Sequence, residues 1–298
     1  MIEEKSAADI IFDTFNILFM AALAFVTLYP MYYVIVASMS NSVELLRNQG
    51  FLWFPKGFTT GAFGMALEHP LILSGYRNIM FIMIVGLTLN ISLTLFAAYF
   101  LASKELMFKK PVLFMMLFTM FFSGGMIPTY LNIRNLGLYN TLWALILPGT
   151  ISVFNTIIYR TAIEAVPDSL AESARIDGAN DFTILFRIIF PLIMPTTVVL
   201  LLYYGIGHWN AWFPGTMYIR DNHLLPIQNI LRAILIAADP GATAGFMGAT
   251  SGSETAFNMY AETIKYAAIV ITTVPVLFIY PFLQRYFVKG TMVGAVKG

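Results

Sequence analysis

The sequence predicts an all-α protein that crosses a membrane with six helices and forms a single domain over residues 1–298. Hydrophobic residues make up 58% of the chain and charged residues only 11%, whereas soluble domains carry about 25% charged residues. Several apolar runs are near the ~20 residues that a helix needs to cross ~30 Å of hydrocarbon. These runs are too long and continuous for barrel strands, so helices are the expected spanning form.

Six such runs follow one another along the chain. We expect spans at Phe15–Ala37, Ile79–Leu101, Val112–Tyr130, Leu142–Thr161, Leu192–Phe213 and Tyr266–Phe287. The first run lacks a small-residue cleavage site and is longer than a signal-peptide core, so we expect it to be retained. In the third run, Gly124 and Gly125 precede Pro128, which favours a bend over close packing there.

Lysine and arginine residues predict the orientation. If the N-terminus is inside, ten of them lie in inner segments or inner span ends and seven in outer segments, accounting for all 17. The positive-inside rule then places both termini in the cytoplasm. The long loops at about 38–78 and 214–265 are extracytoplasmic, and the loop at about 163–190 is cytoplasmic. Within the last outer loop, the apolar stretch from Leu224 to Leu231 predicts a short surface helix.

The cytoplasmic loop at 163–190 carries strong local signals. Pro167 and Asp168 suit the first turn of a helix, because proline fits there and a carboxylate is favourable at the positive end. This helix should run to about Asp177 and end at Gly178, which accepts a left-handed backbone. Asn180 can cap the next helix. Such a short helix at a sharp corner suits the groove of a partner, or it is simply a tight connector between spans.

The same loop resembles a known family motif. It reads Glu172-Ser173-Ala174, three residues, Gly178, nine residues, then Ile188, any residue, Phe190 and Pro191. This is similar to the EAA loop of binding-protein-dependent ABC importer permeases, with Ser173 and Phe190 as conservative departures. Asp177-Gly178-Ala179 resembles the form common in sugar importers. Further similarity to maltose-type permeases lies at Gly125–Tyr130, Leu136–Thr141, Trp209-Asn210 and Gly290–Gly298, so the resemblance extends from about Phe12 onward.

The resemblance implies a type I ABC importer fold in a bacterial cytoplasmic (inner) membrane and an oligosaccharide or similar sugar as solute. It implies a second homologous permease, two ATPase subunits that bind ATP and Mg, and an extracytoplasmic solute-binding protein as partners. Besides membrane lipid and sugar, no nucleic acid and no cofactor on this chain are expected. The residues implied to couple to the ATPase are Glu172, Ser173, Ala174, Asp177, Gly178 and Ala179. The glycine-rich tail is implied to reach between the ATPases; a frayed end is the alternative.

Polar residues inside the predicted spans are candidates for the solute path. We single out Asn90, Asn155 and Tyr203, because intramembrane polar residues often face the bundle interior and tyrosine can stack on sugar rings. Tyrosine near a span end also belongs to the interfacial aromatic belt, which is the alternative interpretation for this residue type.

Other function classes find less support in the sequence. The chain has no cysteine, which excludes disulfides and thiol catalysis, and its three histidines do not have metal-ligand spacing. The predicted spans hold no Asp or Glu, which disfavours an ion-coupled carrier. No phosphate-binding GxxxxGK[ST] loop is present. A membrane-embedded transferase remains an alternative because Asp168, Glu172, Asp177 and Asp181 cluster, although the coupling motif explains them better.

Overall fold

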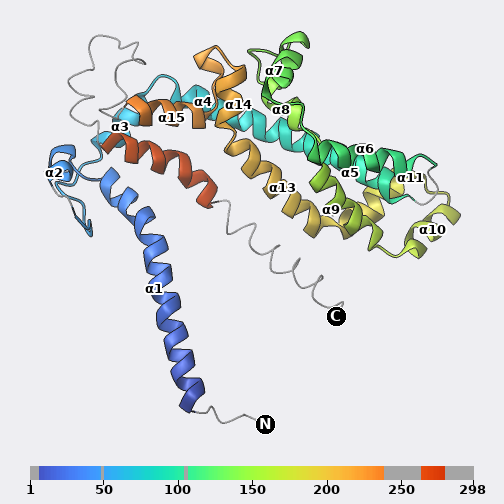
Figure 1. The fold of residues 1–298 in the computed structure, drawn as a ribbon, viewed down its shortest axis with the longest axis horizontal. Coiled ribbons are helices and arrows are strands. Elements are labelled where there is room, and N and C mark those ends of the chain that lie inside the picture. The colour runs from blue at the N-terminus through green and yellow to red at the C-terminus, as the bar shows by residue number, and fades with distance from the viewer. Residues whose placement is uncertain (1–6, 48–49, 104–106, 238–262, 279–298) are drawn as a thin grey trace. The chain divides into compact units, whose positions relative to one another are not determined.

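The computed structural model describes residues 7–47, 50–103, 107–237 and 263–278 (Figure 1). These residues are mostly helical and form no strand, so the all-α prediction is confirmed for this part of the chain. Two described helices, Ala8–Ser38 and Ile72–Ala102, are long and apolar enough to cross a membrane. Two bent helix pairs raise the number to four if each pair is one span. The structure separates into two compact units, one of residues 1–69 and 231–274 and one of 70–230 and 275–298.

The first unit is built around the long helix α1 (Ala7–Ser38), followed by α2 (Ser42–Arg47) and α3 (Gly61–Glu68). The end of α1 packs on a later helix, Thr263–Phe278. The rings of Tyr33 and Tyr266 lie 5.8 Å apart, and the Ser42 and Thr263 hydroxyls are 3.0 Å apart. No described residue covers most of α1, as expected for a helix whose apolar surface faces lipid or another subunit.

The second unit begins with a continuous helix of three segments, α4 (Ile72–Phe81), the π-helical turn η1 (Ile82–Gly86) and α5 (Leu87–Ala102). The predicted span Ile79–Leu101 therefore exists and starts seven residues earlier. The next element differs from its prediction. Instead of one helix over Val112–Tyr130, α6 (Lys109–Phe121) and α7 (Met126–Asn135) meet at 116°. The expected bend at Gly124 and Gly125 is confirmed, because Gly125 has a φ of +91° that other residues rarely adopt.

The fourth predicted span, Leu142–Thr161, is also interrupted. It consists of α8 (Trp143–Ile146), a 3-10 turn η2 (Leu147–Gly149) and α9 (Val153–Glu164). Two non-helical residues, Ile151 and Ser152, follow Thr150, and the Ser152 side chain caps α9. The prediction of one continuous helix is therefore wrong here. Pro148 starts the tight turn because its ring fixes φ and removes the backbone donor.

The rest of the second unit surrounds the predicted cytoplasmic loop. The order is α10 (Asp168–Ile176), α11 (Asp181–Thr183), η3 (Ile184–Ile189), α12 (Phe190–Leu192), α13 (Met194–Trp209), α14 (Trp212–Tyr218) and η4 (Asn222–Leu224). The predicted span Leu192–Phe213 corresponds to α13, which an 83° bend separates from the segment Asp181–Leu192. The predicted surface helix is α15 (Ile227–Ala237), whose start at Ile227 follows the Pro226 break.

Two sequence predictions concern the C-terminal part of the chain. The predicted span Tyr266–Phe287 coincides with the helix Thr263–Phe278 as far as the described residues extend. The glycine-rich tail from Gly290 lies outside the described residues, so its expected reach between the ATPase subunits stays a prediction.

The core of the second unit joins the elements that carry the candidate sites. Its buried side chains come from α5, α9, η3 and α13, and include Leu95, Tyr159, Ile163, Leu185 and Leu200. Figure 1 shows α5, α6 and α9 side by side next to α10 and α11. This packing supports the loop at 163–190 from one side.

Candidate functional site

The short helix α10 ends in a hydrogen-bonded glycine corner. The Gly178 amide donates to the Arg175 carbonyl over 3.0 Å, and the Ala179 amide donates to the Ala174 carbonyl over 2.9 Å. These two bonds form a Schellman motif, in which the residue after the helix takes the left-handed conformation. Gly178 has a φ of +82°. The predicted helix end and glycine corner are therefore confirmed.

The chain leaves the corner through a capped helix start. The Asn180 side chain accepts a hydrogen bond of 2.8 Å from the Thr183 amide, and Asp181 lies in the first turn of α11. Both features are as predicted, since a capping amide and an acidic first turn stabilise a helix N-terminus. At the other end, Pro167 is the residue before α10 and Asp168 its first residue.

The two faces of α10 differ in exposure. Ala171 and Ala174, together with Ala179 beyond the corner, pack against the core of the second unit. The opposite face carries Ser169, Glu172, Ser173 and Ile176, all exposed. Ile176 is 87% exposed, although a large aliphatic side chain gains free energy by leaving water. One face of α10 is thus seated on the unit, and the other is free within the described residues.

This division separates the six residues implied to couple to an ATPase. Glu172, Ser173 and Asp177 present exposed side chains. Ala174 and Ala179 pack inward, so within this chain they seat the helix. Gly178 sets the angle of the corner. Leu170, one helical turn before Ala174, is 43% exposed.

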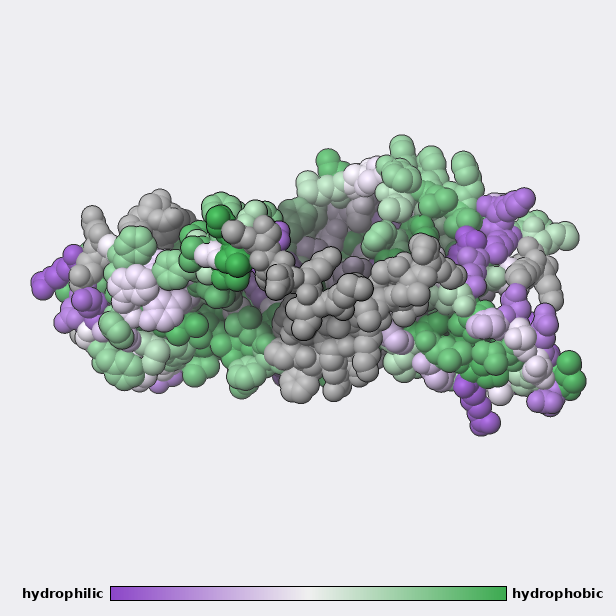
Figure 2. Space-filling view, turned by 90° about the horizontal axis from the view of Figure 1, so that it is seen from below, coloured by the Kyte–Doolittle hydropathy of each residue, from purple (hydrophilic) through white to green (hydrophobic). Residues whose placement is uncertain are grey.

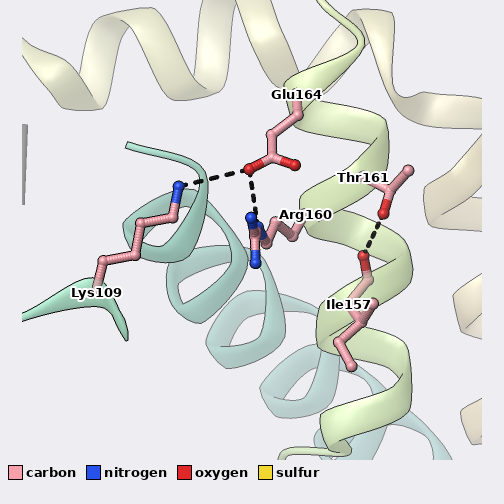
Figure 3. Close-up of polar contacts among 5 residues, drawn as sticks. All are labelled: Lys109, Ile157, Arg160, Thr161 and Glu164. Carbon is pink, nitrogen blue, oxygen red and sulfur yellow. Dashed lines mark hydrogen bonds and ion pairs between the residues drawn. The ribbon is translucent and has the colours of Figure 1, made fainter. Parts of the chain in front are cut away.

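Polar contacts hold α10 and the neighbouring helix ends together. Arg175 Nη2 lies 3.3 Å from Asp181 Oδ1 across the corner, and the Tyr99 hydroxyl donates to the same oxygen over 3.3 Å. Figure 3 shows the second cluster, in which Glu164 Oε1 lies 2.8 Å from Arg160 Nε and 3.6 Å from Lys109 Nζ. The start of α6 is thereby tied to the end of α9.

A groove runs beside these contacts. It has a volume of about 650 Å³ and its polar lining residues include Lys109, Glu164, Asp168, Glu172 and Arg175. Figure 2 shows hydrophilic side chains gathered at the end of the second unit where α10 lies and apolar side chains over the helices beside it. This pattern is typical of a membrane protein whose helix ends reach the aqueous interface.

A polar cluster inside the second unit supports the break before α9. The Asn90 side-chain amide donates to the carbonyls of Gly149, over 3.1 Å, and Thr150, over 2.8 Å. Its oxygen lies 2.8 Å from His208 Nε2. Non-helical backbone at membrane depth is tolerated only where protein groups satisfy its polar atoms. Asn90, which is fully buried, does this for two carbonyls of the break.

Two tyrosine hydroxyls continue the cluster. The Tyr204 hydroxyl accepts a 2.9 Å hydrogen bond from the Ser152 amide and lies 2.7 Å from the Thr94 hydroxyl. The Tyr159 hydroxyl donates to the Thr197 hydroxyl over 2.6 Å. Sequence analysis did not single out Thr94 or Thr197. The spacing of Asn90 and Thr94, four residues apart on one helix face, was a signal that could have found the first of them.

The structure brings two of the three candidate solute-path residues together. Asn155 and Tyr203 line an open pocket of about 380 Å³, with Phe154 and Ile206 as apolar walls. Asn155 is 5% exposed, and no hydrogen-bond partner of its side-chain amide lies among the described residues. The third residue, Asn90, lies outside this lining with its amide bonded inside the protein. Contact of all three with solute stays a prediction.

The acidic residues near α10 do not assemble into a metal site. Asp181 interacts with Arg175 and Tyr99, and among the described residues no group of three His, Asp or Glu side chains could hold a metal ion. The geometry instead offers an exposed helix face at one end of the unit and an open, partly polar pocket within it.

Comparisons with known proteins agree on the class. Residues 74–293 match the family described as binding-protein-dependent transport system inner membrane component. Protein LplC of Bacillus subtilis (strain 168) is 39% identical, with 99% of this chain and 97% of LplC covered. The polygalacturonan/rhamnogalacturonan transport system permease protein YtcP of the same organism is 36% identical, with 97% and 99% covered.

A solved structure shares the fold over nearly the whole chain. It is a chain of a bacterial ABC transporter involved in the import of the acidic polysaccharide alginate, with a TM-score of 0.87, 29% identity, and 95% of this chain and 99% of that chain covered. The resemblance stated from the coupling motif is therefore confirmed, as is the expectation of a transport subunit that is not itself an enzyme. The chain belongs to the binding-protein-dependent transport system inner membrane components, the permease subunits of ABC importers.

Proposed function

We propose that this chain is a permease subunit that imports an oligosaccharide across a bacterial cytoplasmic membrane and is driven by separate ATPase subunits through α10. The observation that carries the coupling role is the two-sided α10, whose Ala171 and Ala174 are seated on the core while Glu172 and Ile176 are exposed. An exposed helix face held at a fixed angle suits a groove in a partner.

The assembly follows from the family. We propose six spans with both termini in the cytoplasm, a second homologous permease, two ATPase subunits that bind ATP and Mg, and an extracytoplasmic solute-binding protein. The interrupted spans at Gly125 and Ile151 fit this proposal, because transporter helices are often discontinuous near a solute path. An oligosaccharide solute is supported by YtcP, whose name assigns it to polygalacturonan and rhamnogalacturonan transport.

Single cysteines test the coupling face and the orientation together, because the native chain has no cysteine. Ser173→Cys should form cross-links to an ATPase subunit and be blocked only by reagents that enter the cytoplasm. Asn222→Cys, in the exposed turn η4, should be blocked from outside and form no cross-link to the ATPase. Labelling of the two positions from the opposite sides would contradict the orientation. An uncross-linked Ser173→Cys in an assembled complex would contradict the coupling role of α10.

The open pocket is proposed to lie on the solute path. Replacing Tyr203 by alanine removes a half-exposed ring beside Asn155 on which a sugar can stack. We expect Tyr203→Ala to raise the solute concentration for half-maximal uptake, by roughly tenfold if a stacking contact of about 1–1.5 kcal/mol is lost. The matched control is Phe114→Ala on α6, which also removes an exposed aromatic ring but lies outside the lining of this pocket. Equal effects of the two substitutions on uptake would remove Tyr203 from the path.

A further inference from the structure

The loop after α2 folds back onto α1 and builds an aromatic cluster there. The Trp53 ring lies 5.9 Å from the Phe25 ring and 5.7 Å from the Tyr29 ring. Phe51 meets Tyr29 edge to face at 5.3 Å. Figure 1 shows the chain that leaves α2 dipping back beside α1 before it continues to α3. The loop thus runs along the helix surface instead of leaving it at the helix end.

Three polar backbone groups of this loop are bound by side chains of α1 and of the residues just after it. The Leu52 amide donates to the Tyr29 hydroxyl over 2.9 Å, and the Tyr32 hydroxyl donates to the Trp53 carbonyl. The Lys56 amide donates to Ser40 Oγ over 3.1 Å, and Pro55 has no amide hydrogen. In water these groups could bind solvent. In a bilayer they need such protein partners.

The position of the loop along α1 indicates how deep the loop lies in the bilayer. The apolar helix Ala8–Ser38 has 31 residues, about 46 Å at ~1.5 Å per residue, so it exceeds the ~30 Å hydrocarbon core. Its last acidic residue before the apolar run is Asp13. Counting ~20 residues from there puts the far boundary near Tyr33. Phe25 and Tyr29, which hold the loop, then lie within the outer half of the bilayer.

Leu52 is buried against the end of α1, but the three aromatic side chains of the loop keep much of their surface exposed. Phe51 is 74% exposed, Trp53 49% and Phe54 77%. Aromatic residues are enriched where a protein meets the interface between hydrocarbon and headgroups. Lys56 follows two residues later, and a lysine can extend its ammonium from such a depth toward headgroup phosphates.

We propose that Phe51, Trp53 and Phe54 form a non-helical lipid anchor, which enters the leaflet at the C-terminal end of α1 and contacts acyl chains and headgroups. In the proposed orientation this is the extracytoplasmic leaflet. The three bound backbone groups, the depth beside Phe25 and the exposed rings favour lipid over water. A binding protein arriving from the aqueous side would meet α1 beyond its membrane boundary, whereas the Trp53 ring packs on Phe25 and Tyr29, below that boundary.

The test uses the assembled complex with cysteine-free partner subunits, reconstituted in phosphatidylcholine nanodiscs. A polarity-sensitive fluorophore is attached to Phe54→Cys and, as the water-facing control, to Glu68→Cys, whose native side chain is charged and exposed at the end of α3. Relative to the control, the label at position 54 should emit at shorter wavelength. Lipid carrying a nitroxide near the headgroup should quench it more, and aqueous iodide should quench it less.

Two outcomes would overturn the proposal. Equal iodide quenching at positions 54 and 68 would place the loop in water. Protection of position 54 from both quenchers would assign it to a protein interface. A second variant, Tyr29→Phe with Tyr32→Phe, removes the two hydroxyls that bind the loop backbone and should increase iodide quenching at position 54. Unchanged nitroxide and iodide quenching there would contradict the role assigned to these hydroxyls.

Discussion

Replacing Gly178 by valine should uncouple transport from ATP hydrolysis. Gly178 has a φ of +82°, which costs an L-residue about 1–2 kcal/mol and a β-branched residue more. A cost of about 1.4 kcal/mol changes a conformational population tenfold. We expect at least about tenfold less uptake at unchanged membrane insertion, with ATP hydrolysis no longer stimulated by the binding protein. Uptake and binding-protein-stimulated hydrolysis in proteoliposomes measure this directly.

A matched variant separates backbone strain from surface contact. Among the described residues, apart from the chain neighbours of Gly178, no atom lies within 4 Å of where its Cβ would be, so an added Cβ meets open space and the cost comes from the backbone conformation. Asparagine also adds a side chain but tolerates the left-handed conformation better than valine. Gly178→Asn should therefore keep most of the coupling. If the asparagine variant lost as much coupling as valine, contact with the ATPase surface would matter more than the helix angle. Full activity of Gly178→Val would contradict the role of the corner.

The glycine corner at Gly178 could be predicted from sequence because its signals are local. Pro167, Asp168, Gly178 and Asn180 each act within one or two turns of their own position, and the structure places all four at helix ends. Local signals could not predict which face of α10 is buried. Ala171 and Ala174 face inward because the core of α5, α9 and η3 lies beneath them, which depends on tertiary packing.

The interrupted spans show why hydropathy overestimates continuity. A window of about 20 residues measures transfer to lipid but does not respond to one or two residues that leave the helix. The Gly124 and Gly125 pair indicated the first break. The second break had a comparable signal in Pro148 and Gly149, since such dipeptides mark turns, but the apolar residues around it favoured a continuous helix.

The hydrogen bonds that support the break before α9 could not be predicted from sequence. Asn90, Tyr204 and the backbone of Gly149–Ser152 lie far apart in sequence, and only the packing of α5 against α9 and α13 brings them within hydrogen-bond distance. Sequence analysis grouped Asn90 with Asn155 because both are polar residues within apolar runs. The structure gives them different surroundings, which leads to a test that distinguishes the two asparagines.

Replacing Asn90 by leucine should destabilise the protein far more than the same change at Asn155. Leucine has a similar volume but cannot bond the carbonyls of Gly149 and Thr150 or the His208 ring. Leaving buried groups unpaired costs about 1–3 kcal/mol in water-soluble proteins, and single side-chain hydrogen bonds within membranes contribute about 0.6–1.7 kcal/mol. We therefore expect a loss of about 2 kcal/mol in the free energy of unfolding.

The measurement is the thermal unfolding midpoint of the purified complex in nanodiscs, where Asn90→Leu should lower the midpoint by about 4–8 °C. Asn155→Leu is the matched control. Both side chains are buried, but no partner of the Asn155 amide lies in the described part of the chain, so leucine there breaks no bond. It should leave the midpoint within about 1 °C while lowering uptake, because Asn155 lines the open pocket.

If Asn90→Leu kept its midpoint and only weakened uptake, Asn90 would belong to the solute path and not to the support of the break. If Asn155→Leu unfolded as readily as Asn90→Leu, the amide of Asn155 would have a structural partner in the assembled complex.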